Sequence, residues 1–141
     1  MSFDKMIIEL GLDPATLPTD EFGEFRIDIV MKHISDELKI DGREVWEIIR
    51  DKSDKQNLEL MLKCCVSELK RFEILGYPPS EDYFKQVAII GQKEGHYEIV
   101  VRMCILYLTA MKQWQQSQGM PLSNSADIMK RLEKARKSLG A

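Results

Sequence analysis

Apolar side chains recur along most of this chain at intervals of three and four residues, which is the spacing of one face of an α-helix. Ile27, Met31, Ile34 and Leu38 show the pattern clearly, because they step by four, three and four positions. Residues 25–29 alternate between apolar and polar as a strand would, but the chain has no second alternating run to pair with them. The pattern therefore predicts an all-α protein.

Glycines mark the expected helix ends. Gly76, Gly95 and Gly119 each follow an apolar stretch of helical spacing, and prolines come soon after the first and the last of them. Glycine is favoured just past a helix because it adopts a left-handed backbone conformation without strain, and proline cannot continue a helix. The three glycines therefore predict the ends of three helices.

Helix starts are expected where a capping residue is followed, three positions later, by Glu or Gln. Asp41 with Glu44 and Ser53 with Gln56 fit this capping-box pattern. The helices expected from all these signals span residues 3–10, from 21 or 24 to 39, from 41 onward, 53–75, 80–94, 96–117 and from 124 or 125 to 138.

The two longest helices have the broadest apolar faces. In residues 53–75 the expected core face consists of Leu58, Met61, Leu62, Cys65, Leu69 and Phe72. In residues 96–117 it consists of Tyr97, Val100, Val101, Cys104, Ile105, Leu108 and Met111. The second face is wide enough to predict a helix at the centre of the fold.

Six or seven helices joined by short loops predict an irregular helical bundle or a stack of helical hairpins. No low-complexity stretch or linker divides the chain, so we expect residues 1–141 to form a single helical domain. A chain of this length buries roughly two-thirds of the surface that it exposes when unfolded, which is enough for an ordinary core without metals or disulfides.

The composition is that of a globular protein, and the features below predict a location in the cytoplasm. Apolar residues make up 44% and charged residues 30% of the chain, and no apolar run approaches the ~20 residues that a membrane helix needs. The first ten residues carry Asp4 and Glu9 and do not resemble a secretory signal. Cys64, Cys65 and Cys104 form no C-x-x-C pair, so we interpret them as small core residues.

Residues 83–108, about a fifth of the chain, resemble a single tetratricopeptide helix–turn–helix. Ala88 matches the small residue of the first helix, Gly95 the turn glycine and Tyr97 the aromatic anchor of the second helix. Val100 departs from the family pattern, which has a small residue there, and no second copy follows at the repeat spacing. The resemblance implies a tight helical hairpin.

No motif for a phosphate-binding loop, a dinucleotide site, a catalytic zinc or a nucleophile elbow occurs in the chain. One alternative is a magnesium site formed by Glu21 with Glu24 and by Glu44 with Glu47, since paired carboxylates suit this cation. In this respect the chain resembles all-α nucleotide pyrophosphatases of the MazG type, which implies Mg²⁺-dependent nucleotide hydrolysis. The leading interpretation treats these residues as solvated helix faces and requires no cofactor.

The charge is unevenly distributed around a net value of −3. Residues 1–70 contain ten Lys or Arg and sixteen Asp or Glu, whereas residues 71–141 contain ten and seven. Lys130, Arg131 and Lys134 lie on the basic face of the last predicted helix. This face is a candidate for an acidic protein partner, and the acidic total disfavours nucleic acid, which is kept as an alternative.

Three aromatic residues are expected at the edges of apolar faces or beside loops, namely Trp46, Tyr77 and Trp114. Trp and Tyr are enriched at binding hot spots. In the absence of a catalytic motif, they favour a non-catalytic protein-interaction module or small regulatory protein with an unidentified protein partner. A groove between helical hairpins would accept a helix or segment of that partner, and a homodimer through Trp46 or Trp114 is compatible with this function.

Overall fold

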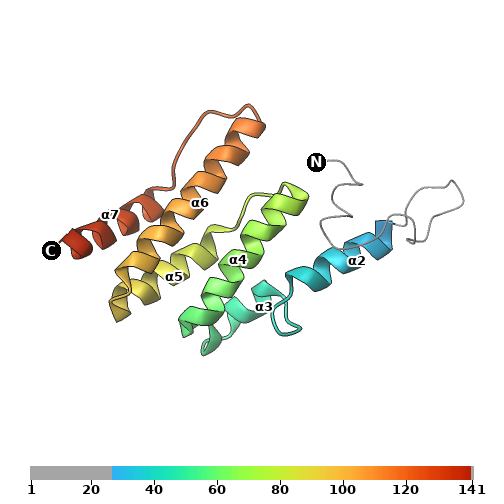
Figure 1. Ribbon diagram of the computed structural model, residues 1–141, viewed down its shortest axis with the longest axis horizontal. Helices are drawn as coiled ribbons and strands as arrows, with labels where there is room; N and C mark the ends of the chain where they lie inside the picture. The colour runs from blue at the N-terminus through green and yellow to red at the C-terminus, as the bar shows by residue number, and fades with distance from the viewer. Residues whose placement is uncertain (1–26, 141) are drawn as a thin grey trace, which may run out of the picture.

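The computed structural model describes residues 27–140 (Figure 1). In this range the chain forms six α-helices and one short 3-10 helix, without a β-strand. The elements are α2 (Ile27–Leu38), α3 (Val45–Arg50), the 3-10 helix η1 (Asp54–Gln56), α4 (Leu58–Leu75), α5 (Glu81–Glu94), α6 (Tyr97–Ser117) and α7 (Ala126–Gly140). The all-α prediction is confirmed for these residues, whereas the helix predicted over 3–10 and the start predicted at 21 or 24 lie outside them.

The helices follow one another in space in the order of the chain. Figure 1 shows them side by side, with α2 at one end of the row and α7 at the other. Adjacent helices form antiparallel pairs, in which α5 packs between α4 and α6, and α6 also packs on α7. Both α2 and α3 contact α4, so α4 connects the first part of the row to the rest.

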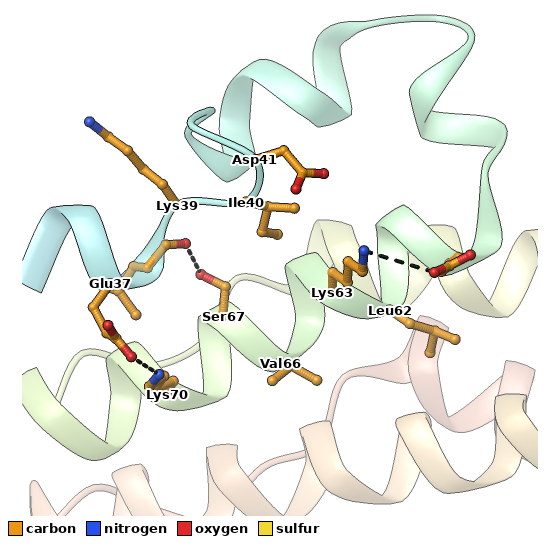
Figure 2. Close-up of a pocket in the computed structure, with 11 residues that line it drawn as sticks. Glu37, Lys39, Ile40, Asp41, Leu62, Lys63, Val66, Ser67 and Lys70 are labelled. Carbon is orange, nitrogen blue, oxygen red and sulfur yellow. Dashed lines mark hydrogen bonds and ion pairs between the residues drawn. The ribbon is translucent and has the colours of Figure 1, made fainter.

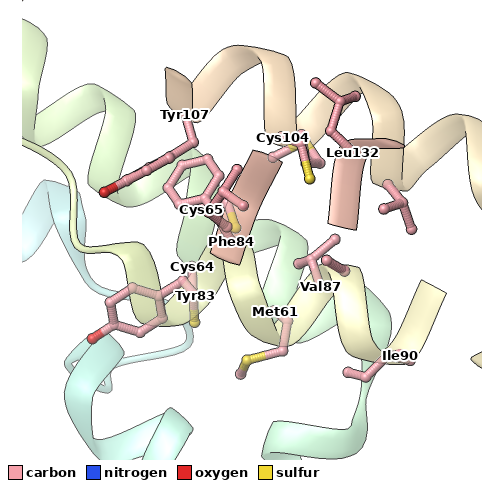
Figure 3. Packing of buried hydrophobic residues seen from close by; sticks show 14 of the residues in the cluster. Met61, Cys64, Cys65, Tyr83, Phe84, Val87, Ile90, Cys104, Tyr107 and Leu132 are labelled. Carbon is pink, nitrogen blue, oxygen red and sulfur yellow. The ribbon is translucent and has the colours of Figure 1, made fainter. Parts of the chain in front are cut away.

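The core is centred on Phe84 of α5, which is fully buried. Its ring centroid lies 5.2 Å from that of Tyr107 on α6, and Figure 3 shows the sulfur-containing residues of α4 and α6 around the pair. All three cysteines are buried and free of disulfides, as predicted from the sequence. Each large apolar side chain buried in this way contributes about 1.5–3 kcal/mol to folding.

A glycine allows α5 and α6 to pack unusually closely. A Cβ atom placed on Gly91 would lie 2.5 Å from a methyl carbon of Val100, far inside van der Waals contact. Both residues are buried, so the missing side chain at Gly91 sets the distance between the two helices.

The predicted helix ends at Gly76 and Gly95 are confirmed. Both residues adopt the left-handed conformation, with φ of 78° and 81°. The Gly76 N–H donates to the carbonyl of Phe72, which closes the last turn of α4. Gly95 turns the chain from α5 directly into α6 and so produces the tight hairpin expected over residues 83–108.

Neither predicted capping box starts an α-helix. Asp41 has a φ of +51° and lies in a turn, so it lacks the extended backbone of a helix cap, and α3 begins after Glu44 instead. Ser53 has a helical backbone, and the side chain of Asp51 accepts hydrogen bonds from the N–H groups of Ser53 and Asp54 to start η1. The cap of α4 is Asn57, whose side chain accepts from the N–H of Leu60 at 3.1 Å.

The buried face of α4 is rotated relative to the prediction. Met61 and Cys65 are buried as expected, but Cys64 and Glu68 are buried too, whereas Leu62 and Leu69 are only half-buried. The physical reason is that α5 covers one side of α4 while α2 and α3 reach it from another. This leaves part of the apolar surface of α4 uncovered.

The expected central helix α6 is also only partly enclosed. Val100 and Cys104 are buried, but Ile105, which was expected in the core, is 40% exposed. The remaining apolar surface of α6 therefore faces away from α5 and α7. None of the helices in residues 27–140 is both long enough and apolar enough to span a bilayer.

Candidate functional site

An open groove of about 490 Å³ lies between the end of α2, the turn that follows it and the first turns of α4. We call it the α2–α4 groove. Figure 2 shows the residues that line it. Its lining residues are Glu37, Leu38, Lys39, Ile40, Asp41, Glu59, Leu62, Lys63, Val66, Ser67 and Lys70.

One wall of the groove is fixed by a bond between the two helices. The Ser67 hydroxyl, on α4, donates to the backbone carbonyl of Leu38 at 2.6 Å. This carbonyl belongs to the last turn of α2, where carbonyls have no partner within the helix. The bond therefore both caps α2 and holds Leu38 against α4.

A tight turn after α2 positions Ile40 in the same wall. Ile40 and Arg43 exchange two backbone hydrogen bonds, of 2.9 and 3.0 Å. The two residues between them, Asp41 and Gly42, both have positive φ, of 51° and 77°. This is the conformation of a type I′ turn, for which Asp-Gly is a favoured sequence.

The turn is tied to the next part of the chain through Arg43. Its guanidinium donates to the carboxylate of Asp54 on η1 at 2.6 Å. This hydrogen bond raises the pKa of Arg43, as pairing with a carboxylate does for a cation. As a result, the turn that carries Ile40 is held by its own two backbone hydrogen bonds and by the ion pair between Arg43 and Asp54.

The opposite wall is the apolar surface that α4 leaves uncovered. Val66 is 60% exposed and Leu62 is half-buried, and both line the groove. Leu38 and Ile40 complete an apolar lining made by four side chains from two parts of the chain.

Charged residues of both signs form the rim of the groove. Lys70 on α4 donates to Glu37 on α2 at 2.6 Å, and Lys63 lies 3.8 Å from Glu59. The Ser67 hydroxyl already has its partner in Leu38. The groove thus presents an apolar centre and a polar rim, and within its described lining no polar groups converge as they do in sites for small polar ligands.

The three aromatic residues predicted for binding lie at separate places. Trp46 on α3 is 52% exposed, and the Arg50 guanidinium lies 5.2 Å from its ring centroid. Tyr77, 59% exposed, follows the end of α4, whereas Trp114 is half-buried in the last turns of α6. Since α3 precedes the start of α4, Trp46 and Tyr77 are near opposite ends of a helix roughly 27 Å long.

The predicted basic residues lie on α7, at the other end of the row from the α2–α4 groove (Figure 1). Lys130 and Lys134 are exposed. Arg131 is partly withdrawn from solvent and contacts Asp127 at 3.0 Å, and the same carboxylate lies 3.3 Å from Lys85 of α5. Of the three basic residues, Arg131 therefore pairs with a carboxylate of its own helix.

Two of the four carboxylates of the alternative magnesium site lie in the described part of the chain. Glu44 is half-buried and accepts a hydrogen bond from Ser35 at 3.2 Å, and Glu47 is exposed in the first turn of α3. Glu21 and Glu24 lie outside the described residues. Among residues 27–140, no three His, Cys, Asp or Glu side chains are grouped so that they could hold a metal ion, and the pyrophosphatase function stays a prediction.

The buried thiols are poor nucleophiles. Burial raises the pKa of Cys64 and of Cys104 to about 11, and it raises the pKa of Cys65 further above its usual range. Because the reactive species is the thiolate, all three residues are protonated and inert near neutral pH. Their place in the core accounts for them without a catalytic role.

The apolar spacing does not predict the α2–α4 groove. It predicts burial for Leu38 and Leu62, and Val66 lies beside the predicted stripe of α4. An available signal was Val66 itself, an apolar residue off that stripe and between two lysines, Lys63 and Lys70. Comparison with protein-family models, curated proteins and solved structures finds no match for this chain.

Proposed function

We propose that this chain is a non-catalytic protein-interaction module, and that the α2–α4 groove binds the apolar face of an amphipathic helix from a protein partner. The observation that carries this proposal is the exposure of Val66 in a groove whose other apolar lining side chains are Leu38, Ile40 and Leu62. Such a surface gains free energy when an apolar partner removes it from water.

The length of the groove suits a helix. Its lining runs along α4 from Glu59 to Lys70, about three helical turns or roughly 17 Å. A helix that lies in a groove of this length presents three or four apolar side chains at positions i, i+3, i+4 and i+7. The four apolar lining residues provide a matching number of contacts.

The rim favours a partner with charges of both signs. The α4 edge carries Glu59, Lys63 and Lys70, and the opposite edge carries Glu37, Lys39 and Asp41. A purely acidic or purely basic peptide would meet like charges on both edges, which costs affinity. A mixed-charge amphipathic helix avoids this repulsion.

A peptide-selection experiment tests the proposal. A displayed library of roughly 15-residue peptides, with apolar residues fixed at helical spacing and the other positions varied, is selected against the full chain. Selected peptides are then titrated against the unmodified protein and against Val66→Glu. The proposal expects Val66→Glu to weaken binding by roughly tenfold or more, because a charge then occupies the centre of the apolar contact.

Leu122→Glu is the matched control. Leu122 is another exposed apolar residue, located in the loop between α6 and α7 and outside the groove, and its replacement should leave the affinity unchanged. Backbone amide NMR shifts on titration should change along α4 and the turn after α2. Selected peptides that bind Val66→Glu as well as the unmodified protein would overturn the assignment of this groove.

A further inference from the structure

Helix α6 is mostly apolar between positions 99 and 111. Arg102 is the only charged residue between positions 99 and 111. A helix that is apolar on all sides is normally buried on all sides, because each exposed apolar face costs free energy in water. The structure shows which part of α6 satisfies this expectation within one chain.

The inner side of α6 is well covered. Val100, Cys104 and Tyr107 are buried between α5 and α7. The opposite side is open, since Ile105 and Leu106 are each 40% exposed although they are adjacent in sequence. Arg102 and Thr109, which are also exposed, lie between these two side chains around the helix, so this side of α6 has no cover within the described residues.

The open side forms a second groove, of about 410 Å³, which we call the α6 outer face. It is lined by Glu98, Val101, Arg102, Ile105, Leu106 and, from α7, Leu139. Leu139 is 48% exposed and also borders a smaller hollow at the turn between α5 and α6, so the apolar surface continues around the end of α6. This face is separate from the α2–α4 groove, with which it shares no residue.

The α6 outer face carries one acidic and one basic residue, so its charges can pair with those of the same face on a second copy. Glu98 and Arg102 are four residues apart on one helix, yet neither forms an ion pair with another residue in the described part of the chain. They have opposite signs and flank the apolar residue Val101. In a two-fold symmetric contact, residue i of one copy meets residue j of the other and the reverse, so one Glu and one Arg give two ion pairs.

We propose that the α6 outer face is a self-association surface, which binds the same face of a second copy of this chain. Glu98 of each copy pairs with Arg102 of the other, which fixes the register and the symmetry. The apolar side chains of Val101, Ile105, Leu106 and Leu139 pack around these ion pairs. This proposal is independent of the function of the α2–α4 groove.

The first measurement is the mass of the full chain in solution, by sedimentation velocity over a wide range of concentrations. The proposal expects a species of twice the 16.3 kDa chain mass that increases with concentration. Ile105→Asp should raise the dimer dissociation constant at least tenfold, whereas Val66→Glu in the α2–α4 groove should leave it unchanged. A monomer at every concentration, or a dimer that Val66→Glu disrupts and Ile105→Asp does not, would overturn the proposal.

A charge-exchange experiment tests the pairing and does not depend on the folding of one apolar variant. Glu98→Arg alone places two arginines opposite each other, and Arg102→Glu alone places two glutamates opposite each other, so each variant should dimerise poorly. Mixed in equal amounts, they should form a heterodimer, because every pair then joins opposite charges. The double variant Glu98→Arg with Arg102→Glu should likewise recover the dimer.

The recovery is the decisive readout, since a general loss of stability in either variant would not be repaired by mixing. Failure of both the mixture and the double variant to dimerise, while the unmodified chain does, would show that Glu98 and Arg102 do not meet across the contact. Binding of a different protein to this face by a chain that stays monomeric would also contradict self-association.

Discussion

The hydroxyl of Ser67 and the carbonyl of Leu38 join two helices that are 29 positions apart in the sequence. Their hydrogen bond, 2.6 Å long and withdrawn from solvent, holds the end of α2 on α4 and shapes one wall of the α2–α4 groove. Two expectations follow, one for the stability of the chain and one for binding in the groove.

Ser67→Ala should lower the free energy of unfolding by about 1 kcal/mol, because the variant leaves the Leu38 carbonyl without its partner. It should also weaken peptides selected for the α2–α4 groove. The measurement is urea-induced unfolding followed by circular dichroism. Ser117→Ala is the matched control, since Ser117 donates to the carbonyl of Trp114 at the same distance of 2.6 Å but in an exposed position. Equal effects of the two variants would contradict the structural role of Ser67.

Gly91→Ala should destabilise the chain, although alanine favours a helix over glycine by about 1 kcal/mol. The new Cβ atom would lie 2.5 Å from a methyl carbon of Val100, and a valine in a helix has almost one rotamer and cannot turn away. Overpacking of this kind costs about 1–3 kcal/mol, which outweighs the gain in propensity.

A double-mutant cycle with Val100→Ala tests whether this clash is the cause. Removal of the valine methyl groups makes room for the Cβ atom, so the two substitutions together should cost less than the sum of their separate effects. Thermal or urea unfolding of the four proteins measures the coupling. Additive effects, or a more stable Gly91→Ala, would show that the helices can move apart at this point.

Glu68 should make stability depend on pH. Burial raises the pKa of this carboxylate, and the nearby Arg71, 2.8 Å away, offsets the shift only in part. Because the pKa in the folded state exceeds the value of about 4.3 in the unfolded chain, the contribution of Glu68 is fully present below that value and is lost as pH rises through the folded pKa.

Relative to Glu68→Gln, the unmodified chain should therefore be more stable at pH 4 than at pH 7. The measured quantity is the difference in unfolding free energy between the two proteins at each pH, since this difference cancels the other titrating groups. Glu73→Gln, an exposed position on the same helix, controls for the loss of a carboxylate from α4. The same trend for both variants, or the opposite trend for Glu68→Gln, would contradict the assignment.

The cysteines should react slowly with thiol reagents as long as the chain is folded. Burial keeps the three thiols protonated and out of solvent, with a pKa of about 11 for Cys64 and for Cys104. We expect rapid modification in denaturing urea and little modification in buffer at neutral pH, measured with a chromogenic disulfide reagent. Fast reaction of one cysteine in the folded chain would show that the core opens near it.

Much of the fold could be predicted because its signals are local. The spacing of apolar residues and the glycines at positions 76 and 95 identified the helices and their ends, and both features depend only on neighbouring residues. Asp41 shows where local reasoning failed. Its pattern with Glu44 satisfies a capping box, but Asp41-Gly42 also satisfies a type I′ turn, and the turn prevails because it lets Ile40 and Arg43 form two hydrogen bonds.

The candidate sites could not be predicted, because they depend on which faces remain uncovered after packing. The periodicity of α4 gives an apolar face but does not indicate that α2 meets only part of it, which leaves Val66 exposed. In the same way, the breadth of the apolar surface of α6 predicted a central helix, whereas Ile105 and Leu106 lie open. Of the exposed residues at the two candidate sites, Ile105 was expected in the core, whereas Val66 and Leu106 lie beside the predicted core faces of their helices.

The order of the helices also bears on how the chain folds. Because α5 packs on α4, α6 on α5 and α7 on α6, each major interface joins segments that are neighbours in sequence. Contacts of this kind close short loops at a small entropic cost, and proteins rich in them fold quickly. The row from α4 to α7 can therefore assemble in the direction of synthesis, with each new helix docking on the one completed before it.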